Sequence, residues 1–509
     1  MKISIARLSM IAFISGACVM VLEMVGARML APFLGTSIVV WTSLIGIILA
    51  SLSLGYWLGG RLADRTVSQK LLAWLLLGAA LSILLTVLSH TLILQWVTQF
   101  ESLHTSAVLA ASLLFALPAV FCGMISPYVT RLALCEVRTA GATVGTLNAI
   151  STVGSIVGTF LGGFVLIAWV SSPTIIYGIA LVMAASALLS GGKMLVPIVA
   201  VLALIAGIGG AFSSKISSLV AADGLIYFQE TPYNSIQIKQ GIQEPSMRQV
   251  RLLITDENRT QSMTFVDAPA RLALGYSQYF AIATALKPEA QRVLMLGGGG
   301  YSIPKWLLGP DSPLQAGRFQ LDVVELDPGI TDAAERFLGL ERDLHPNLAI
   351  FHEDARRFVN RSAQSSEPGY QLIFGDVFNS MASVPFHVGT REAAQSIHRS
   401  LSDDGVFMMN VISAVEGDQG RLYRAIHAAF AETFGTTASF LVKAPETPTT
   451  VQNVMLLAAK QPIDFERLLA NAPDLAPLLA NRYEPTLTND VPALTDQHAP
   501  VERYIGTAH

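Results

Sequence analysis

Seven long apolar stretches fill the first 212 residues and constrain the fold of this chain more than any other feature. A helix needs roughly 20 mostly apolar residues to cross a bilayer. Stretches of about that length lie at 9–31, 37–60, 71–93, 105–128, 142–169, 173–190 and 194–212. Glu23 and Arg28 interrupt the first, which lacks a small-residue cleavage site, so we interpret it as an anchor and not as a signal peptide. The sequence predicts a polytopic membrane domain of about seven helices at 1–212.

Small residues within these stretches predict close helix contacts. Gly55 and Gly59 are four residues apart, as are Gly154, Gly158 and Gly162, and such stripes let helix backbones approach one another. The ionisable Glu23 and Arg28 have two interpretations. Charged residues inside a membrane are functional candidates, but both side chains could equally lie near an interface and extend to it.

The charges divide at the same place as the apolar pattern. Residues 1–212 carry nine Lys and Arg against four Asp and Glu, a net of +5, and the remaining 24 basic and 33 acidic residues give 213–509 a net of −9. An acidic domain without a basic stripe argues against a nucleic-acid partner. It is compatible with a cationic substrate or with an ordinary solvated surface. Three cysteines and nine histidines show no metal-ligand spacing, so no metal site is predicted.

From residue 213 the pattern changes to short strand-like segments. LIYFQE, SIQIKQ, RQVRLLIT and SMTFV alternate as half-buried strands do, and they predict a small β-rich lead-in at 213–270. Regular alternation of strands and helices follows, with strands expected at 292–296, 321–326, 348–351, 370–375, 406–413, 438–444 and 453–460. Residues 271–509 are therefore predicted to form an α/β Rossmann-like domain of the class I methyltransferase type, with seven strands.

A glycine-rich turn follows the first strand of this domain. Gly297, Gly298, Gly299 and Gly300 lie between that strand and a helix, where a bare backbone can approach a ligand and the helix dipole favours an anion. Free N–H groups in such a turn could also bind a carboxylate. An NAD enzyme is the natural alternative, but GGGGYSIP lacks the GxGxxG spacing.

Acidic residues end the next three strands. Glu325, Asp354 and Asp376 would converge on one crevice, because ligands of open α/β sheets bind outside the carboxyl ends of the strands. A carboxylate at Glu325 can accept both hydroxyls of a ribose. Each acid alone could be a helix cap, but the three together with the glycine turn predict a nucleoside-binding site.

These motifs resemble those of the spermidine synthases and their membrane-fused bacterial relatives. VLMLGGGGYSIP, VVELD, HEDARRFV and YQLIFGDVF occur in the order of that family over roughly 225–505. VLEMVGARMLAPFLG, GDVFNSMASVPFHVGTRE and LTDQHAPVERY are similar to segments of the fused subgroup. The resemblance implies a transferase that uses S-adenosylmethionine or its decarboxylated form, passes an aminopropyl-type group to an amine or polyamine, and releases methylthioadenosine without a metal.

The resemblance also implies roles for individual residues. Asp376 would be the catalytic carboxylate that orients and deprotonates the attacking amine. Glu325 would hold the ribose and Asp354 the adenine amino group, within a cofactor-binding set of Gly297, Gly298, Gly299, Glu325, Asp354, Gln261 and Tyr233. The candidates on the substrate side are Tyr276, His387 and Asp496. For His387, a surface or loop-packing role is the alternative.

Several positions depart from the family pattern. Spermidine synthases have Gly-Gly-Gly-Asp-Gly-Gly, in which the Asp grips the transferred aminopropyl amine, and Gly300 stands in its place here. Their Tyr-His-Glu motif is Tyr276-Ser277-Gln278, Asn234 follows Tyr233 where they have Gln, and Glu257 stands at the family's Asp distance from Gln261. The nucleoside pocket is therefore better supported than the polyamine pocket. Methyl transfer, acceptor-free cleavage of S-adenosylmethionine, and a sensor or transporter without turnover stay open.

Loop charges and the inferred cosubstrate give opposite orientations. Basic residues cluster before the first stretch and after the second, fourth and sixth, at Lys2, Arg7, Arg61, Arg65, Lys70, Arg131, Arg138 and Lys193. The positive-inside rule makes those loops cytoplasmic, and seven spans would then place the soluble domain outside. We expect a multi-pass protein of a bacterial-type inner membrane with its soluble domain in the cytoplasm, where the cosubstrate occurs. Lipid is the implied partner of the helices, and a homo-oligomer is compatible with the sequence.

Overall fold

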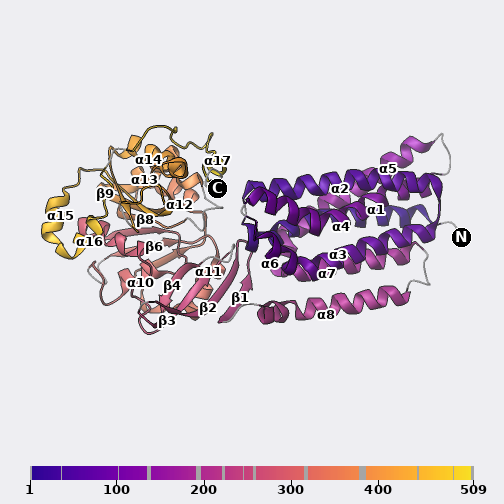
Figure 1. Ribbon diagram of the computed structural model, residues 1–509, viewed down its shortest axis with the longest axis horizontal. Coiled ribbons are helices and arrows are strands. Elements are labelled where there is room, and N and C mark those ends of the chain that lie inside the picture. Colours follow the sequence, from indigo (N-terminus) through magenta and orange to yellow (C-terminus); the bar gives the residue numbers. More distant parts are fainter. Residues whose placement is uncertain are drawn as a thin grey trace. The chain divides into compact units, whose positions relative to one another are not determined.

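The computed structural model describes residues 3–35, 37–100, 102–134, 139–190, 196–220, 224–244, 246–255, 260–314, 319–377, 386–443, 446–484 and 487–505. The chain forms two compact units, Met1–Ala222 and Asp223–His509. Figure 1 colours the first from indigo to magenta and the second from magenta to yellow. The last helix of the first unit continues to Val220, past the predicted boundary at 212.

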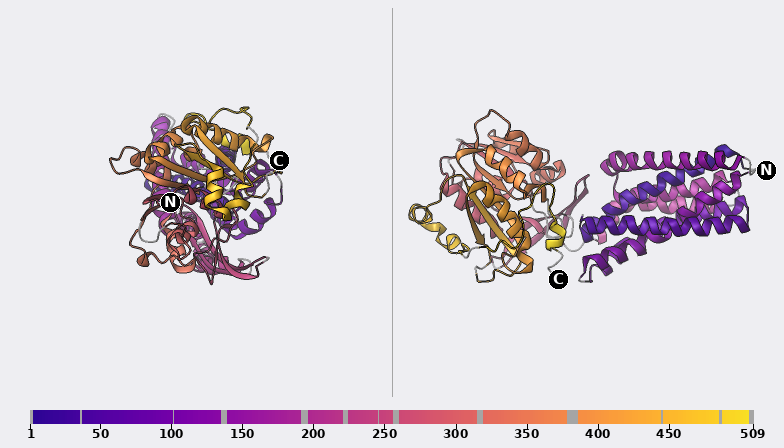
Figure 2. Two further views of the ribbon diagram at one scale, coloured as in Figure 1. Left: turned by 90° about the vertical axis from the view of Figure 1, so that its left-hand side faces the viewer. Right: turned by 90° about the horizontal axis from the view of Figure 1, so that it is seen from above.

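Long helices make up the first unit, and Figures 1 and 2 show them lying side by side. They are α1 (Ile5–Leu34), α2 (Ile38–Arg65), α3 (Gln69–Val97), α4 (Leu103–Ala133), α5 (Ala140–Phe160) with a π-helical turn and α6 (Ile167–Trp169), α7 (Ser172–Leu189) and α8 (Val196–Val220). Among the described residues, six helices are long and apolar enough to cross a membrane, and seven were predicted. The seventh predicted stretch, 194–212, overlaps α8, in which the residues searched, Val196–Gly209, also form an apolar helix.

The glycine stripes lie where helices touch, as predicted. A Cβ at Gly154 would be 2.1 Å from the carbonyl oxygen of Phe13, and one at Gly158 would be 2.4 Å from that of Ala17, so α5 packs directly on the backbone of α1. On α2, a Cβ at Gly55 would be 2.3 Å from the carbonyl oxygen of Val120 on α4. A side chain at these positions would force the helices apart.

The second unit begins with the predicted lead-in sheet. Its strands are β1 (Leu225–Glu230), β2 (Ser235–Gln243), β3 (Arg248–Ile254) and β4 (Thr260–Phe265), paired antiparallel in the order β1-β2-β3-β4. A short segment then leads through a 3-10 turn (Tyr276–Tyr279) and α9 (Phe280–Leu286) to the main sheet.

The main sheet has the predicted seven strands, which confirms the fold class. They are β5 (Arg292–Leu296), β6 (Gln320–Val324), β7 (Leu348–Phe351), β8 (Tyr370–Gly375), β9 (Leu401–Ser413), β10 (Thr436–Leu441) and β11 (Gln452–Ala459). The order is β10-β11-β9-β8-β5-β6-β7. Strands β5 to β9 are parallel, and β11 is antiparallel to both of its neighbours. The carboxyl ends of β5 to β8 therefore share one edge.

Apolar cores cover both faces of this sheet, because apolar side chains on its central strands point to both sides. In β5, Val293 and Met295 join one core, and Leu294 and Leu296 join the other. The first core includes α9, α10 (Ser302–Leu308), α11 (Pro328–Phe337) and β2. The second includes α12 (Ala355–Ser362), α13 (Arg391–Ser400) and α14 (Arg421–Phe434). Burial on both faces fixes the strands that carry the candidate site.

Candidate active site

The glycine turn after β5 is shaped by backbone that only glycine adopts easily. Gly297 has a φ of 91° and Gly299 a φ of 49°. A Cβ at Gly297 would lie 2.3 Å from the carbonyl oxygen of Asp376, whereas at Gly299 it would meet nothing within 4 Å. The turn thus packs tightly against the end of β8 and leaves the backbone at Gly299 open to a ligand.

Glu325 closes this turn from the end of β6. Its Oε2 accepts hydrogen bonds from the backbone N–H groups of Gly298 (2.9 Å) and Gly299 (3.0 Å), and Oε1 accepts one from Asp327 N (2.9 Å). Burial raises the pKa of the carboxyl group, and these three N–H donors oppose the rise. The expectation that these N–H groups are free to bind a carboxylate is wrong for Gly298 and Gly299, because the Glu325 side chain reaches back to them.

Asp376 sits in a network of neutral hydrogen-bond donors at the end of β8. Its Oδ2 accepts from the Tyr276 hydroxyl (2.8 Å), and its Oδ1 accepts from Asn410 Nδ2 (3.1 Å). Asn410 Oδ1 in turn accepts from Asn453 Nδ2 (3.0 Å). Burial raises the pKa of Asp376, and the two donors partly offset it. Burial and the Asp376 charge hold the pKa of Tyr276 well above its usual value, so the phenol stays a donor.

A cavity of about 200 Å³ connects the glycine turn with Asp376. Its polar lining comes from β4, the 3-10 turn before α9, the glycine turn, the start of α10, the end of β8, β9 and β11. It comprises Thr260, Gln261, Ser262, Tyr276, Ser277, Gly298, Gly299, Gly300, Ser302, Asp376, Asn410 and Asn453. The predicted residues Gln261, Tyr276 and Asp376 are therefore brought together. At Gly300, an added Cβ would lie 2.3 Å from Ser262 Oγ, so the lead-in strand occupies the space of any side chain there.

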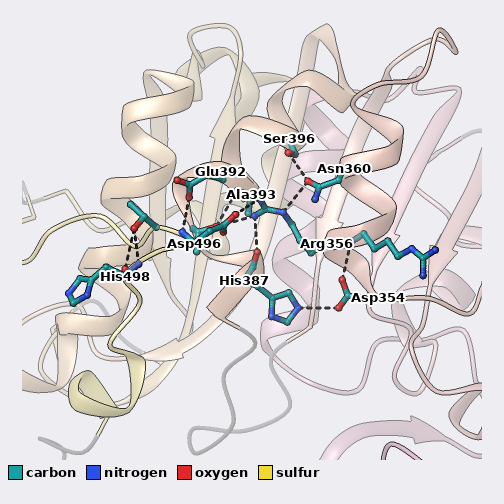
Figure 3. A network of polar contacts seen from close by, with 12 residues as sticks. Asp354, Arg356, Asn360, His387, Glu392, Ala393, Ser396, Asp496 and His498 are labelled. Atoms are coloured by element: carbon teal, nitrogen blue, oxygen red, sulfur yellow. Dashed lines mark hydrogen bonds and ion pairs between the residues drawn. The ribbon is translucent and has the colours of Figure 1, made fainter. Parts of the chain in front are cut away.

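Asp354 and His387 form a second cluster at the end of β7, drawn in Figure 3. Asp354 caps α12 by accepting from Arg357 N (2.9 Å), and its Oδ2 lies 3.1 Å from His387 Nε2. The hydrogen bond from His387 is the main cause that lowers the pKa of Asp354. His387 was predicted on the substrate side with Asp376, but its contact is with Asp354. Among the described residues, those lining the Asp376 cavity include neither His387 nor Asp496.

The remaining predicted residues lie apart from the cavity. Asp496 pairs with Arg356 (2.9 Å) and accepts from the Thr390 hydroxyl (2.7 Å). Tyr233 lies in the turn between β1 and β2 with its side chain half exposed, and its neighbour Asn234 donates to Asp327 Oδ2 (3.0 Å). A cofactor contact for Tyr233 stays a prediction. Glu257 lies outside the described residues.

Sequence reasoning missed Asn410, Asn453 and Arg356. The two asparagines stand in otherwise apolar strands, VFMMNVIS and VQNVMLL. An amide in such a strand is costly to bury without a partner, and that signal could have drawn attention to both. Arg356 had no comparable signal, because its partners come from distant segments. Among the described residues, no group of three His, Cys, Asp or Glu side chains is arranged to hold a metal.

Comparison with known proteins supports the resemblance seen in the motifs. No family model matches the chain. The polyamine aminopropyltransferase of Vibrio vulnificus is 26% identical over 322 residues, which are 60% of this chain and 97% of that protein. The N-terminal histidine N-methyltransferase of Emericella nidulans is 37% identical over 89 residues, or 17% of this chain and 15% of that one.

A solved structure of a probable spermidine synthase from Corynebacterium glutamicum is also similar. It is 16% identical, with a TM-score of 0.42, and the match covers 55% of this chain and 98% of that one. Given the similarity to the Vibrio enzyme, the chain is spermidine synthase-like, with an N-terminal helical region that is compatible with a membrane fusion.

Proposed function

We propose that this protein is a membrane-tethered transferase acting on S-adenosylmethionine or its decarboxylated form. It would transfer an aminopropyl-type group to an amine or polyamine acceptor and release methylthioadenosine. The observation that carries the proposal is the continuity of the site. A buried carboxylate, Glu325, is fixed on the glycine turn, and one cavity runs from that turn to Asp376. Together they offer a nucleoside anchor and a base at one edge of the sheet.

The nucleoside half of the substrate would bind along β5, β6 and β7. Glu325 would accept the ribose hydroxyls, and Asp354 would accept from the adenine amino group. The open backbone at Gly299 supports this arrangement, since nothing would meet even an added Cβ there within 4 Å. The sulfonium would then lie near Asp376, at the end of the strand on the other side of β5.

Asp376 would act as the base for the attacking amine. The amine nitrogen forms a bond to the carbon attached to sulfur, the carbon–sulfur bond breaks, and its electron pair stays on sulfur as a neutral thioether. The nitrogen loses a proton to Asp376. A raised pKa suits this task, because a base is most effective when its pKa is closer to the working pH. Tyr276 and Asn410 would keep the carboxylate in place.

A second use of the same substrate is favoured by two observations. Position 300 is glycine, so the cavity lacks the carboxylate with which spermidine synthases grip the transferred amine. The chain is also 37% identical over 89 residues to a histidine N-methyltransferase. Methyl transfer, or cleavage of intact S-adenosylmethionine without an acceptor, would use the same nucleoside anchor.

Product analysis tests the proposal. The full-length protein is incubated in detergent with each sulfonium compound, with and without an amine such as putrescine, and the nucleoside product is identified. Amine-dependent methylthioadenosine supports aminopropyl transfer. Amine-independent methylthioadenosine indicates cleavage, and S-adenosylhomocysteine indicates methyl transfer. Binding without any product would indicate a sensor or transporter and contradict an enzymatic role.

A further inference from the structure

Arg356 ties together three segments that are far apart in the sequence, and Figure 3 shows the connections. Its side chain is only 13% exposed. Nη2 donates to Asp496 Oδ2 (2.9 Å), while Nη1 donates to the carbonyl oxygen of His387 (2.9 Å) and to Thr390 Oγ1 (3.0 Å). A planar guanidinium with several donors can fix such an arrangement in a way that a lysine cannot.

The segment around Asp496 is itself held on the start of α13. Asp496 Oδ1 accepts from the fully buried Thr390 hydroxyl (2.7 Å), and Asp496 N donates to Glu392 Oε2 (2.9 Å). The backbone N–H of Arg391 donates to Leu494 O (2.8 Å). The C-terminal segment, the loop at 386–390 and the first turn of α12 are therefore joined through one largely buried cation.

This junction sets where His387 lies. The carbonyl oxygen of His387 accepts a hydrogen bond from Arg356, which lies two residues after Asp354. The ring Nε2 of His387 lies 3.1 Å from Asp354 Oδ2. The contacts close a ring from Asp354 through Arg356 to His387 and back. The Asp354 and His387 side chains are 40% and 41% exposed, unlike Arg356, so the pair is open to a ligand.

We propose that His387 is a positioning residue for Asp354, and that Arg356 and Asp496 hold His387 in place for that task. The inference rests on the proposed function, in which Asp354 accepts a hydrogen bond from a 6-amino purine. The carboxylate already accepts from Arg357 N on Oδ1 and from His387 on Oδ2, and a carboxylate can accept about four bonds. Because these two bonds fix the orientation of the Asp354 carboxylate, its remaining acceptor sites favour a purine that donates a hydrogen bond.

A 6-keto purine would place an acceptor oxygen against this carboxylate in place of the donating amino group, so that two acceptors would face each other. Sites built for a particular hydrogen bond discriminate against analogues that lack it, because the polar group that faces the ligand loses its partner. The structure therefore assigns discrimination between 6-amino and 6-keto nucleosides to the Asp354–His387 pair, and ties that discrimination to the C-terminal segment.

The test measures binding of methylthioadenosine and methylthioinosine to the full-length protein in detergent by calorimetry. The wild type should prefer the 6-amino compound. His387→Phe removes the donor, and the preference should fall by about three- to tenfold, the range for losing one ordinary hydrogen bond. His387→Gln keeps an N–H donor and should restore most of the preference.

Asp496→Asn should lower the same ratio, although Asp496 does not touch the base. Asp490→Asn is the matched control. It removes another ion pair between the C-terminal segment and a helix, in which Nε and Nη2 of the buried Arg424 each lie 2.6 Å from Asp490. The hydrogen bonds that the structure describes for Arg424 go to Asp490, Val415 and Gly417 and not to His387. A merely structural role predicts that both variants lower the melting temperature and leave the ratio alone.

Two outcomes distinguish failure of this inference from failure of the proposed function. A wild type that discriminates, with the same ratio in His387→Phe and Asp496→Asn, would overturn this inference and leave the nucleoside pocket standing. A wild type that binds neither nucleoside would overturn the proposed function and this inference with it.

Discussion

The Tyr276 hydroxyl donates a 2.8 Å hydrogen bond to Oδ2 of Asp376, while Asn410 holds the other carboxylate oxygen at 3.1 Å. The three side chains come from the segment before α9, the end of β8 and the middle of β9. Two neutral donors on one carboxylate favour its charged form, but burial outweighs them and raises its pKa. This balance makes the proposed base sensitive to each donor.

The first prediction concerns pH. If Asp376 must be ionised to accept a proton, activity rises with pH through its raised pKa. Tyr276→Phe and Asn410→Leu each remove a donor to the charged form, which raises that pKa further. The acid limb of a kcat/KM profile should therefore move to higher pH in both variants. Tyr279→Phe, which loses only a hydrogen bond with Asn481 (2.7 Å), should leave the limb in place. A shift to lower pH would contradict the assignment of Asp376 as the base.

The second prediction separates catalysis from binding at Asp376. Asp376→Asn keeps the size of the side chain but removes the base, so turnover should fall by about 10²–10⁴-fold, the usual contribution of general-base catalysis. Methylthioadenosine has no amine to be deprotonated, and its affinity should change little. Single-turnover kinetics and calorimetry measure the two effects. Activity close to that of the wild type would remove Asp376 from the mechanism.

The third prediction concerns Glu325. Glu325→Ala should weaken methylthioadenosine binding by about 1.5–3 kcal/mol, the range for hydrogen bonds to charged groups. It should also destabilise the domain, because the N–H groups of Gly298 and Gly299 lose their acceptor. Glu325→Gln keeps an acceptor oxygen, so its affinity for methylthioadenosine and its melting temperature should lie between those of the wild type and of Glu325→Ala. Unchanged affinity in Glu325→Ala would disprove the ribose assignment.

The fourth prediction concerns which sulfonium compound binds. In spermidine synthases an Asp at this position pairs with the terminal ammonium of decarboxylated S-adenosylmethionine. This chain has Gly300 there and lacks that negative charge. An unpaired ammonium is costly in a crevice of low dielectric, and a substrate carboxylate is no longer repelled. The wild type should therefore bind intact S-adenosylmethionine at least as well as the decarboxylated form. A marked preference for the decarboxylated compound, measured side by side with the intact one, would contradict this argument from Gly300.

The same position offers a gain-of-function variant. Gly300→Asp alone should destabilise the protein, because its Cβ would lie 2.3 Å from Ser262 Oγ and 2.7 Å from Ser262 Cβ. Combined with Ser262→Gly, the new carboxylate has room and should shift the preference toward the decarboxylated compound by tenfold or more, about 1.4 kcal/mol. Ser262→Gly alone is the control and should leave the preference as in the wild type.

The fifth prediction concerns orientation. We expect the second unit to face the cytoplasm, since its proposed cosubstrate is found there, although seven spans and the loop charges predict the outside. Two reporters are fused after residue 509, one that is active only in the cytoplasm and one that is active only in the periplasm. We expect activity from the first and none from the second. Fusions in the loop after α2 provide the reference for the cytoplasmic side. Activity of only the periplasmic reporter at the C-terminus would demand a ligand from outside the cell.

The local sequence determined the helices and strands and the acidic residues of the candidate site. Apolar length predicts helices that could cross a membrane, glycine spacing predicts where helices pack closely, and the alternation after residue 225 predicts both sheets. The acids could be found because Glu325 and Asp376 directly follow β6 and β8 and Asp354 comes three residues after β7, and parallel strands bring their carboxyl ends together. The number of strands followed as well, since each strand is a separate apolar run between turns.

Tertiary structure alone decided which side chains meet. Asn410 bonds Asp376, and Asn453 supports Asn410 because β9 and β11 pair in one particular register, with Asn410 opposite Met455 and Asn453 opposite Ile412. His387 lies against Asp354 because Arg356 is held by Asp496, 140 residues later in the sequence. Such contacts depend on the geometry of distant segments, and hydrogen bonds of 3 Å require a precision that spacing along a chain does not contain. The sequence thus specified the strands and their acids, and packing chose the partners of those acids.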